Sequence, residues 1–301
     1  MTLTALSLTP SARNWLSHTK TARVLNAFDR ACNLINQDNI MLAIVTSERG
    51  LTPFAMLVAS DHPTPFQTLS TESTVSLEGG CLRVGSLRID CTTAALCDPR
   101  PEWLAVRRAF ASAPAALDNM IAVAASLGKA GSLLDLLEPP VEPSPAQRAF
   151  LARARLGATA LVHGLVKRSL EMDLAGAKAL AGLGNGLTPA GDDFIVGVML
   201  AAWAGLYGPD AEALCPPIAE VAAGHTTALS AAYLHAAARG ECTAQWHRLF
   251  DAICRDQQGL RLAIGDLLAV GHTSGADALA GFLATHYLVP EDSIHNIKFR
   301  S

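Results

Sequence analysis

The hydrophobic pattern of this chain changes at a proline-rich stop, Asp98-Pro99-Arg100-Pro101. From Cys32 to this stop, short apolar runs rich in branched residues alternate with turn residues such as Glu78-Gly79-Gly80, a pattern typical of strands. After Pro101 the chain is rich in alanine and leucine, which carry the lowest helix penalty. We therefore predict an α+β fold, with an N-terminal small antiparallel β-sheet or barrel followed by a mostly α-helical C-terminal domain.

The chain has 301 residues, enough for two ordinary domains, and we place the boundary near residue 100. The predicted parts are a β-rich domain over 1–100 and a helical domain over 101–301, with a proline-rich linker at 138–145. A short helix or irregular arm is expected over 11–28, and a loose terminus over 290–301. Strands are predicted at 41–47, 54–59, 66–69, 74–77, 82–84 and 87–90. Helices are predicted at 102–111, 115–137, 146–172, 173–181, 189–207, 211–239, 244–255, 260–270 and 274–288.

Charge and hydrophobicity narrow the class of protein. The formal net charge is −4 and no basic run is present, which argues against nucleic-acid binding, because that affinity depends on neutralising phosphates. The longest apolar run, 194–208, is too short to span a bilayer. The N-terminus lacks the basic start and apolar core of a signal peptide. We predict a cytoplasmic protein that binds neither nucleic acid nor membrane.

The most informative segment is a glycine-rich turn, Gly182-Leu183-Gly184-Asn185-Gly186-Leu187-Thr188-Pro189-Ala190-Gly191-Asp192-Asp193, that precedes an almost uncharged apolar stretch. Glycine adopts positive φ angles readily, so such a turn can present consecutive backbone N–H groups to an anion. Thr188 followed by Pro189 predicts a helix start, with Thr188 as N-cap and Pro189 as the first helical residue. Asp192 and Asp193 would then lie in the first turn, where the helix dipole favours negative charge.

The two adjacent aspartates have more than one interpretation. Aspartates in a first turn often only cap the helix, and a glycine-rich turn often only permits tight packing. Two carboxylates ahead of an uncharged helix exceed what a cap requires, and neighbouring residues on a helix point in different directions. Asp192 and Asp193 are therefore candidates for anchoring the turn, for facing a ligand, or for binding Mg²⁺; no other cofactor is predicted.

A second segment, Gly271-His272-Thr273-Ser274-Gly275-Ala276-Asp277, shares the spacing Gly-x-Thr-x-x-x-Asp with Gly186, Thr188 and Asp192. We expect two helix N-termini of similar design to converge on one anionic ligand, since a helix N-terminus offers N–H groups that lack intrahelical partners. A chance similarity between two capped helices is the alternative.

A third segment, Gly224-His225-Thr226-Thr227-Ala228-Leu229-Ser230, places three hydroxyls close together. Thr226 and Ser230 are four positions apart and are expected on one helix face, although such hydroxyls also bond back to helix carbonyls. His225 and His272 are candidate acid, base or ligand-binding groups, with a structural role as the alternative. The sequence does not carry a P-loop, nucleophile-elbow or H-E-x-x-H pattern, and a dinucleotide fingerprint fits poorly because the turn does not follow a predicted strand.

In their order along the chain, 182–194, 226–230 and 271–277, the three segments resemble those of a bacterial family that was formerly of unknown function and is now associated with the AllH subunit of oxamate carbamoyltransferase. The resemblance covers 146–288, and the first motif is its most specific part. Asn185 stands where relatives often have proline, and Ala190 where they often have serine. The missing hydroxyl at Ala190 argues against a direct ligand role for that position.

The resemblance implies a subunit that works with AllF-like and AllG-like subunits in allantoin breakdown. Their complex interconverts oxalurate plus phosphate with oxamate plus carbamoyl phosphate, and these small anions agree with anion-binding turns. We therefore predict a carbamoyltransferase subunit whose candidate catalytic residues are Asp192, Asp193, His272 and Asp277. The candidate substrate-binding residues are Gly184, Asn185, Gly186, Leu187, Thr188, Gly191, Thr226, Thr227, Ser230, Thr273, Ser274 and Gly275.

Two other functions are compatible with the same sequence features. A non-catalytic ligand-sensing or assembly subunit would use the same anion site and leave the chemistry to its partners. An enzyme acting on another small carboxylate would have the same sequence requirements. Whether the chain also forms a homo-oligomer is a further open question.

Overall fold

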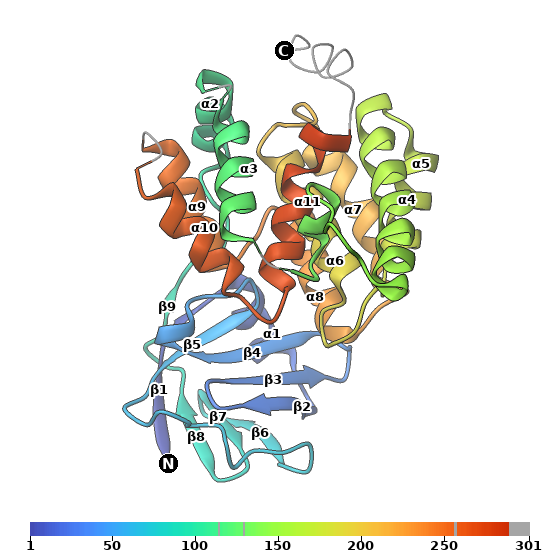
Figure 1. Cartoon of the computed structure of the whole chain (residues 1–301). Helices are drawn as coiled ribbons and strands as arrows, with labels where there is room; N and C mark the ends of the chain where they lie inside the picture. The colour runs from blue at the N-terminus through green and yellow to red at the C-terminus, as the bar shows by residue number, and fades with distance from the viewer. Residues whose placement is uncertain (114, 129, 256–257, 289–301) are drawn as a thin grey trace. The chain divides into compact units, whose positions relative to one another are not determined.

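Strands and helices segregate along the chain, as Figure 1 shows for the computed structural model, which describes residues 1–113, 115–128, 130–255 and 258–288. The residues divide into two compact units, Met1–Pro99 with Cys242–Ala244, and Arg100–Glu241 with Gln245–Ser301. The first unit holds the strands and the second holds most of the helices. The predicted α+β class is confirmed.

The first unit is built on one mixed sheet. Its strands are β1 (Thr2–Leu8), β2 (Ala22–Phe28), β3 (Ala31–Asn36), β4 (Met41–Thr46), β5 (Ala55–Ala59), β6 (Val75–Glu78), β7 (Cys81–Val84), β8 (Leu87–Asp90) and β9 (Ala95–Leu96). The order is β2-β3-β4-β5-β1-β8-β7-β6, with β9 beside β1. A bridge between Arg23 and Thr74 links the two ends, so the sheet is a nearly closed barrel. The ladders β4–β5, β1–β8 and β1–β9 are parallel, whereas the prediction was an antiparallel sheet.

The N-terminal residues form more regular structure than the predicted arm. In β1, Leu3, Ala5 and Leu8 face the core, and helix α1 (Pro10–His18) follows, with the Thr9 hydroxyl accepting a hydrogen bond from the Ala12 N–H at 3.2 Å. Residues 22–28, which the prediction joined to the helix, form β2 because they pair with β3. The predicted strand at 66–69 is wrong: this segment is a turn.

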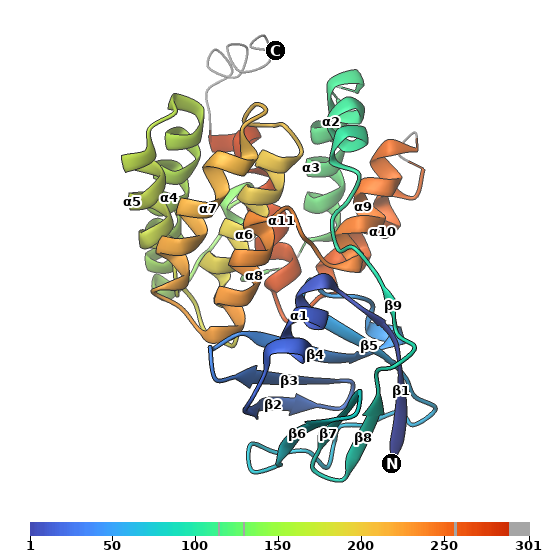
Figure 2. The same cartoon turned by 180° about the vertical axis from the view of Figure 1, so that it is seen from behind.

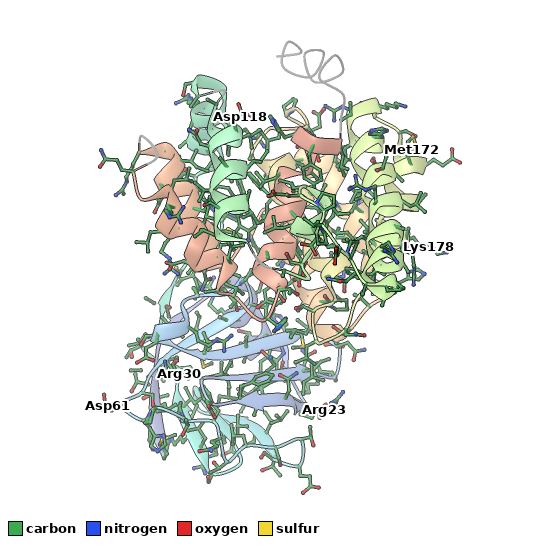
Figure 3. All side chains as sticks on the ribbon, viewed as in Figure 1. Arg23, Arg30, Asp61, Asp118, Met172 and Lys178 are labelled. Carbon is green, nitrogen blue, oxygen red and sulfur yellow. The ribbon has the colours of Figure 1, made fainter. Side chains whose placement is uncertain are left out.

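The second unit contains the remaining helices, among which α6 and α11 lie between α4 and α5 on one side and α3 and α10 on the other (Figures 1 and 2). They are α2 (Trp103–Ser112), α3 (Ala116–Leu127), the 3-10 turn η2 (Leu133–Leu136), α4 (Pro145–Lys167), α5 (Leu170–Leu180), α6 (Ala190–Trp203), α7 (Ala211–Ala223), α8 (Ala228–Ala238), α9 (Ala244–Cys254), α10 (Leu260–Leu268) and α11 (Ser274–Leu288). Charged side chains of the outer helices, such as Asp118 and Lys178, are exposed (Figure 3).

Three of the predicted helices end early or are interrupted, each for a local reason. The helix predicted over 146–172 ends at Lys167, because Arg168 takes a left-handed conformation with φ of 58°. The helix predicted over 211–239 is interrupted by the turn of residues 224–227, which separates α7 from α8. The helix predicted over 115–137 ends at Leu127, where Gly128 follows with φ of 41°. The predicted loose end at 290–301 lies outside the described residues.

Helices α6 and α11 pack unusually closely along their length. A Cβ atom added to Gly197 of α6 would lie 1.8 Å from the Ala278 carbonyl oxygen, and one added to Gly281 of α11 would lie 2.0 Å from the Phe194 carbonyl oxygen. The contact is reciprocal, because each helix places a glycine against a backbone carbonyl of the other. The Thr188 and Ser274 hydroxyls, at the starts of the two helices, lie 2.8 Å apart, so the N-termini of α6 and α11 lie at the same end.

Helix α4 is the one described helix that is long and apolar enough to cross a membrane by length and composition, and α2 with α3 pass the same test as a bent pair. Helix α4 packs along α5: a Cβ added to Gly176 would lie 2.3 Å from the Leu161 nitrogen. Core helices of globular proteins commonly pass such a test, so the finding is weak evidence for a membrane span.

Candidate functional site

The glycine-rich turn of residues 182–189 connects α5 to α6 within the second unit. Gly182, Gly184 and Gly186 have φ angles of 68°, 117° and 113°, which side-chain-bearing residues rarely adopt. Gly184 lies close to the start of α6, since an added Cβ would be 2.8 Å from the Ala190 nitrogen. Space around Gly186 is open, and Asn185, Gly186 and Leu187 are exposed.

Five consecutive backbone N–H groups in this turn, from Gly184 to Thr188, donate no hydrogen bond to any described residue. Backbone donors in a folded protein are nearly always paired with protein or with water. A run of N–H groups in a glycine-rich turn forms a concave donor surface of the kind that binds anions. The turn is therefore equipped to hold a small anionic group.

The start of α6 differs from the predicted cap. The helix begins at Ala190 with Pro189 as its N-cap residue, and no side chain caps it. The Thr188 hydroxyl instead lies 2.8 Å from the Ser274 hydroxyl, at the first residue of α11. The prediction of Thr188 as N-cap is thus wrong, because its hydroxyl joins the first and second motifs to each other.

Asp192 is buried, at 1% exposure, and its carboxylate links three segments. One oxygen accepts the Gly182 N–H at 2.9 Å, and the other accepts the Thr226 hydroxyl. Burial raises the pKa of Asp192, and the hydrogen bonds from Thr226, Gly182 and Ser230 oppose that rise. These contacts hold the glycine-rich turn in place.

Asp193 has different surroundings. Its Oδ2 atom is buried and has no hydrogen-bond partner among the described residues. Burial raises the pKa of Asp193 well above its usual range, and the neighbouring Asp277 carboxylate raises it further, while hydrogen bonds from the Ser274 and Thr188 hydroxyls oppose the rise. Burial and a like-charged neighbour both favour the protonated acid.

Asp277 is the counterpart of Asp193 in α11. Each is the fourth residue of its helix, and the two are 84 positions apart, the separation that also relates Gly197 to Gly281. The shared sequence spacing instead aligned Asp277 with Asp192, one residue away. Asp277 is fully buried and accepts the Leu133 N–H of η2 at 2.6 Å. The two helix N-termini thus bring Asp193 and Asp277 close together.

The third motif joins the same region through the turn between α7 and α8. Thr227 caps α8 by accepting the Ser230 N–H at 3.1 Å, and its hydroxyl donates to the Leu187 carbonyl at 2.6 Å. Thr226 precedes the helix, so Thr226 and Ser230 do not lie on one helix face as predicted. Both nevertheless bond to Asp192.

The other predicted site residues divide into packing and surface positions. An added Cβ on Gly191 would lie 2.0 Å from the Leu180 carbonyl oxygen, and one on Gly275 would lie 1.8 Å from that of Leu267. These two glycines therefore permit close packing. His225 and His272 are exposed, and His225 Nδ1 lies 2.9 Å from the Val221 carbonyl oxygen. Thr273 is half-buried in the turn that precedes α11.

The carboxylates do not form a metal cluster. Among the described residues, no group of three or more histidine, cysteine, aspartate and glutamate side chains is arranged to hold a metal ion. Asp192 faces Gly182 and Thr226, whereas Asp193 faces Ser274 and Thr188. The geometry does not support joint Mg²⁺ ligation by the two aspartates.

Two contributors to this site, Leu133 and Gly197, were not predicted from the sequence. Leu133 acts through its backbone N–H, which every non-proline residue has. Gly197 had a usable signal, since an isolated glycine inside an apolar helix often marks close packing.

Comparison with protein families agrees with this arrangement of motifs. Residues 180–286 match the family described as oxamate carbamoyltransferase subunit AllH, and residues 4–96 match the AllH family N-terminal domain. The chain belongs to the AllH family. The AllH match begins within two residues of the glycine-rich turn and ends inside α11, so it contains all three motifs. No solved structure matches the chain.

Proposed function

We propose that this AllH-family chain is a substrate-binding subunit of an oxamate carbamoyltransferase-type enzyme, which converts oxalurate and phosphate into oxamate and carbamoyl phosphate. In this proposal, AllF-like and AllG-like subunits are its partners. The anion is bound at the glycine-rich turn, beside the start of α11.

The observation that carries the proposal is the run of five N–H groups from Gly184 to Thr188 that have no partner among the residues the structure describes. The adjoining hydroxyls of Thr188 and Ser274 place two further polar groups, from two helix starts, beside the turn. Oriented N–H groups at helix N-termini suit phosphate and carboxylate oxygens, which all four members of the reaction carry.

The neighbouring acids suggest how the site would assist the chemistry. In the direction that forms carbamoyl phosphate, a phosphate oxygen adds to the ureido carbonyl carbon of oxalurate. The C–N bond then breaks, its electron pair moves to the oxamate nitrogen, and that nitrogen takes up a proton. A protonated Asp193, linked to the turn by the Thr188 and Ser274 hydroxyls, is the proposed proton source. His272, exposed on the second turn, is the alternative acid.

A second candidate function, a non-catalytic binding or assembly subunit, is favoured by the exposure of the turn. Asn185, Gly186 and Leu187 are exposed, whereas group transfer to a substrate other than water is usually shielded from solvent. Partner subunits would then cover the anion and supply the reacting groups. An enzyme acting on another small carboxylate is the third alternative.

Thermal denaturation of the full chain tests the binding proposal. Phosphate, carbamoyl phosphate, oxamate and oxalurate are compared, with and without Mg²⁺, against sodium chloride at matched ionic strength. A ligand that binds the folded state raises the melting temperature. We expect phosphate and carbamoyl phosphate to raise it without Mg²⁺, and no change with any of the four would refute the anion site.

Reconstitution with the two partner subunits separates the two roles. Full turnover by the partners alone would assign this chain to sensing or assembly. If turnover requires this chain and is lost in the Asp193→Asn variant, the catalytic role is supported.

A further inference from the structure

The turn that offers the five N–H groups is held at both ends by one neighbouring segment, residues 224–230, which comprises the link between α7 and α8 and the first residues of α8. At its start, the Gly182 N–H donates to Asp192, and the same carboxylate accepts the Thr226 hydroxyl. At its far end, the Leu187 carbonyl accepts the Thr227 hydroxyl at 2.6 Å. Between these two attachments lie the N–H groups that have no partner in the described part of the chain.

Close packing fixes the first attachment. A Cβ added to Gly182 would lie 2.7 Å from the His225 carbonyl oxygen, so only glycine lets the two backbones approach this closely. Gly182 also has a φ of 68°, which a side chain would strain. The start of the turn therefore packs closely against the segment of residues 224–230, to which Asp192 also connects it.

The side-chain oxygens of Asp192 and Thr227 already have hydrogen-bond partners within the protein. Asp192 is buried and accepts bonds from the turn, from Thr226 and from Ser230. Thr227 donates to Leu187 while accepting the Ser230 N–H, so it caps α8 and holds the turn at once. Neither side chain is free to take a ligand, but both fix the backbone that does.

We infer that Asp192 and Thr227 are positioning residues that hold the glycine-rich turn in its anion-binding conformation before the ligand arrives. This inference rests on the proposed anion site. A turn with several glycines loses much conformational freedom when it is ordered, and ordering it in advance removes that cost from binding. Loss of either attachment should therefore weaken anion binding even though the donor groups remain.

The test measures inorganic phosphate binding to the full chain by calorimetry and amide hydrogen exchange across residues 182–191. We expect Thr227→Val to weaken phosphate binding roughly tenfold and to accelerate exchange in this segment. Thr227→Ser keeps the hydroxyl and should restore both. Asp192→Asn, which keeps an oxygen acceptor for Gly182, should bind phosphate more tightly than Asp192→Ala.

Ser144→Ala is the matched control, because Ser144 caps α4 in the same unit by accepting the Gln147 N–H at 3.2 Å. It should lower stability as any lost cap does and leave phosphate binding unchanged. Wild-type chain that does not bind phosphate would refute the proposed function itself. Wild-type binding that Thr227→Val and Asp192→Ala reproduce, with unchanged exchange, would overturn the positioning role alone.

Discussion

The Thr188 hydroxyl lies 2.8 Å from the Ser274 hydroxyl, although the two residues are 86 positions apart in the chain. This contact joins the starts of α6 and α11, and the same two hydroxyls hydrogen-bond to Asp193. It depends on the close parallel packing of the two helices at Gly197 and Gly281. Helix packing thus brings a polar surface turn next to a pair of buried acids.

Replacing Asp193 with asparagine should separate stability from activity. Burial and Asp277 both oppose ionisation of Asp193, so a neutral amide of the same shape is compatible with the fold and removes the repulsion. We expect Asp193→Asn to unfold in urea at the same or a higher concentration than the wild type at pH 7. Turnover of the reconstituted complex should fall at least a hundredfold, the low end of what general acid–base catalysis contributes.

Asp173→Asn is the control for this prediction, because Asp173 is also a buried helical carboxyl but lies outside the three motifs. Its turnover should stay close to that of the wild type. Near-normal turnover in Asp193→Asn would exclude Asp193 as the proton source and leave His272 as the candidate.

Gly197→Ala should disrupt the contact between α6 and α11. The added Cβ would lie 1.8 Å from the Ala278 carbonyl oxygen, so the helices must move apart, at a cost of about 3 kcal/mol or more in the free energy of unfolding. In Gly265→Ala the nearest atom, Leu127 Cδ1, is 4.0 Å away, so this helix should gain about 0.5–1 kcal/mol. Chemical denaturation of both variants checks the contrast, and equal effects would show that the close packing is not rigid.

Gly186→Ala should lower anion affinity through the backbone alone. No atom lies within 4 Å of the added Cβ, so the change acts on the φ angle of 113° rather than on packing. Gly79→Ala in the first unit is the matched control, with open space and a φ of 56°. Each variant should lose about 1–2 kcal/mol of stability from backbone strain. Only Gly186→Ala should weaken phosphate binding in calorimetry, and an equal loss in both variants would argue against the turn as the binding site.

The fold class followed from local patterns, but the order of the strands did not. Runs such as β4 and β5 are apolar and branched, so their sequences predict strands on their own. Strand β2 has no alternating pattern, and it is a strand because β3 lies beside it. Two of the parallel ladders likewise depend on β1 pairing with β8 and β9, which are distant in sequence.

The candidate site likewise combines features that local sequence patterns predict with features that only the tertiary fold determines. The glycine-rich turn, the aspartates and the hydroxyl segment were visible as motifs because glycine, aspartate and threonine have distinct local preferences. The sequence did not show which aspartate faces Asp277. The shared spacing aligns Asp277 with Asp192, whereas the packing of α6 on α11 places Asp193 beside it. The partner of the Thr188 hydroxyl was mispredicted for a related reason: a local cap competes with a distant hydroxyl that only the tertiary fold supplies.

Asp173 should make stability depend on pH between about 4 and 6. Burial raises the pKa of this carboxyl to about 6, and the Arg168 guanidinium opposes the rise. In the unfolded chain the pKa is near 3.9. Between these values the folded protein binds the proton more tightly, so the contribution of Asp173 to stability falls as pH rises through this window. The total change corresponds to roughly 3 kcal/mol.

The pH dependence of Asp173→Asn isolates this contribution, because the amide carries no titrating proton. Urea denaturation at pH 4, 5, 6 and 7 should show the variant gaining stability relative to the wild type as pH rises, with most of the gain complete by pH 7. Arg168→Gln removes the opposing charge, so it should shift the window of the wild-type carboxyl to higher pH. A constant difference between wild type and Asp173→Asn across this range would show that the Asp173 carboxyl titrates as it does in the unfolded chain.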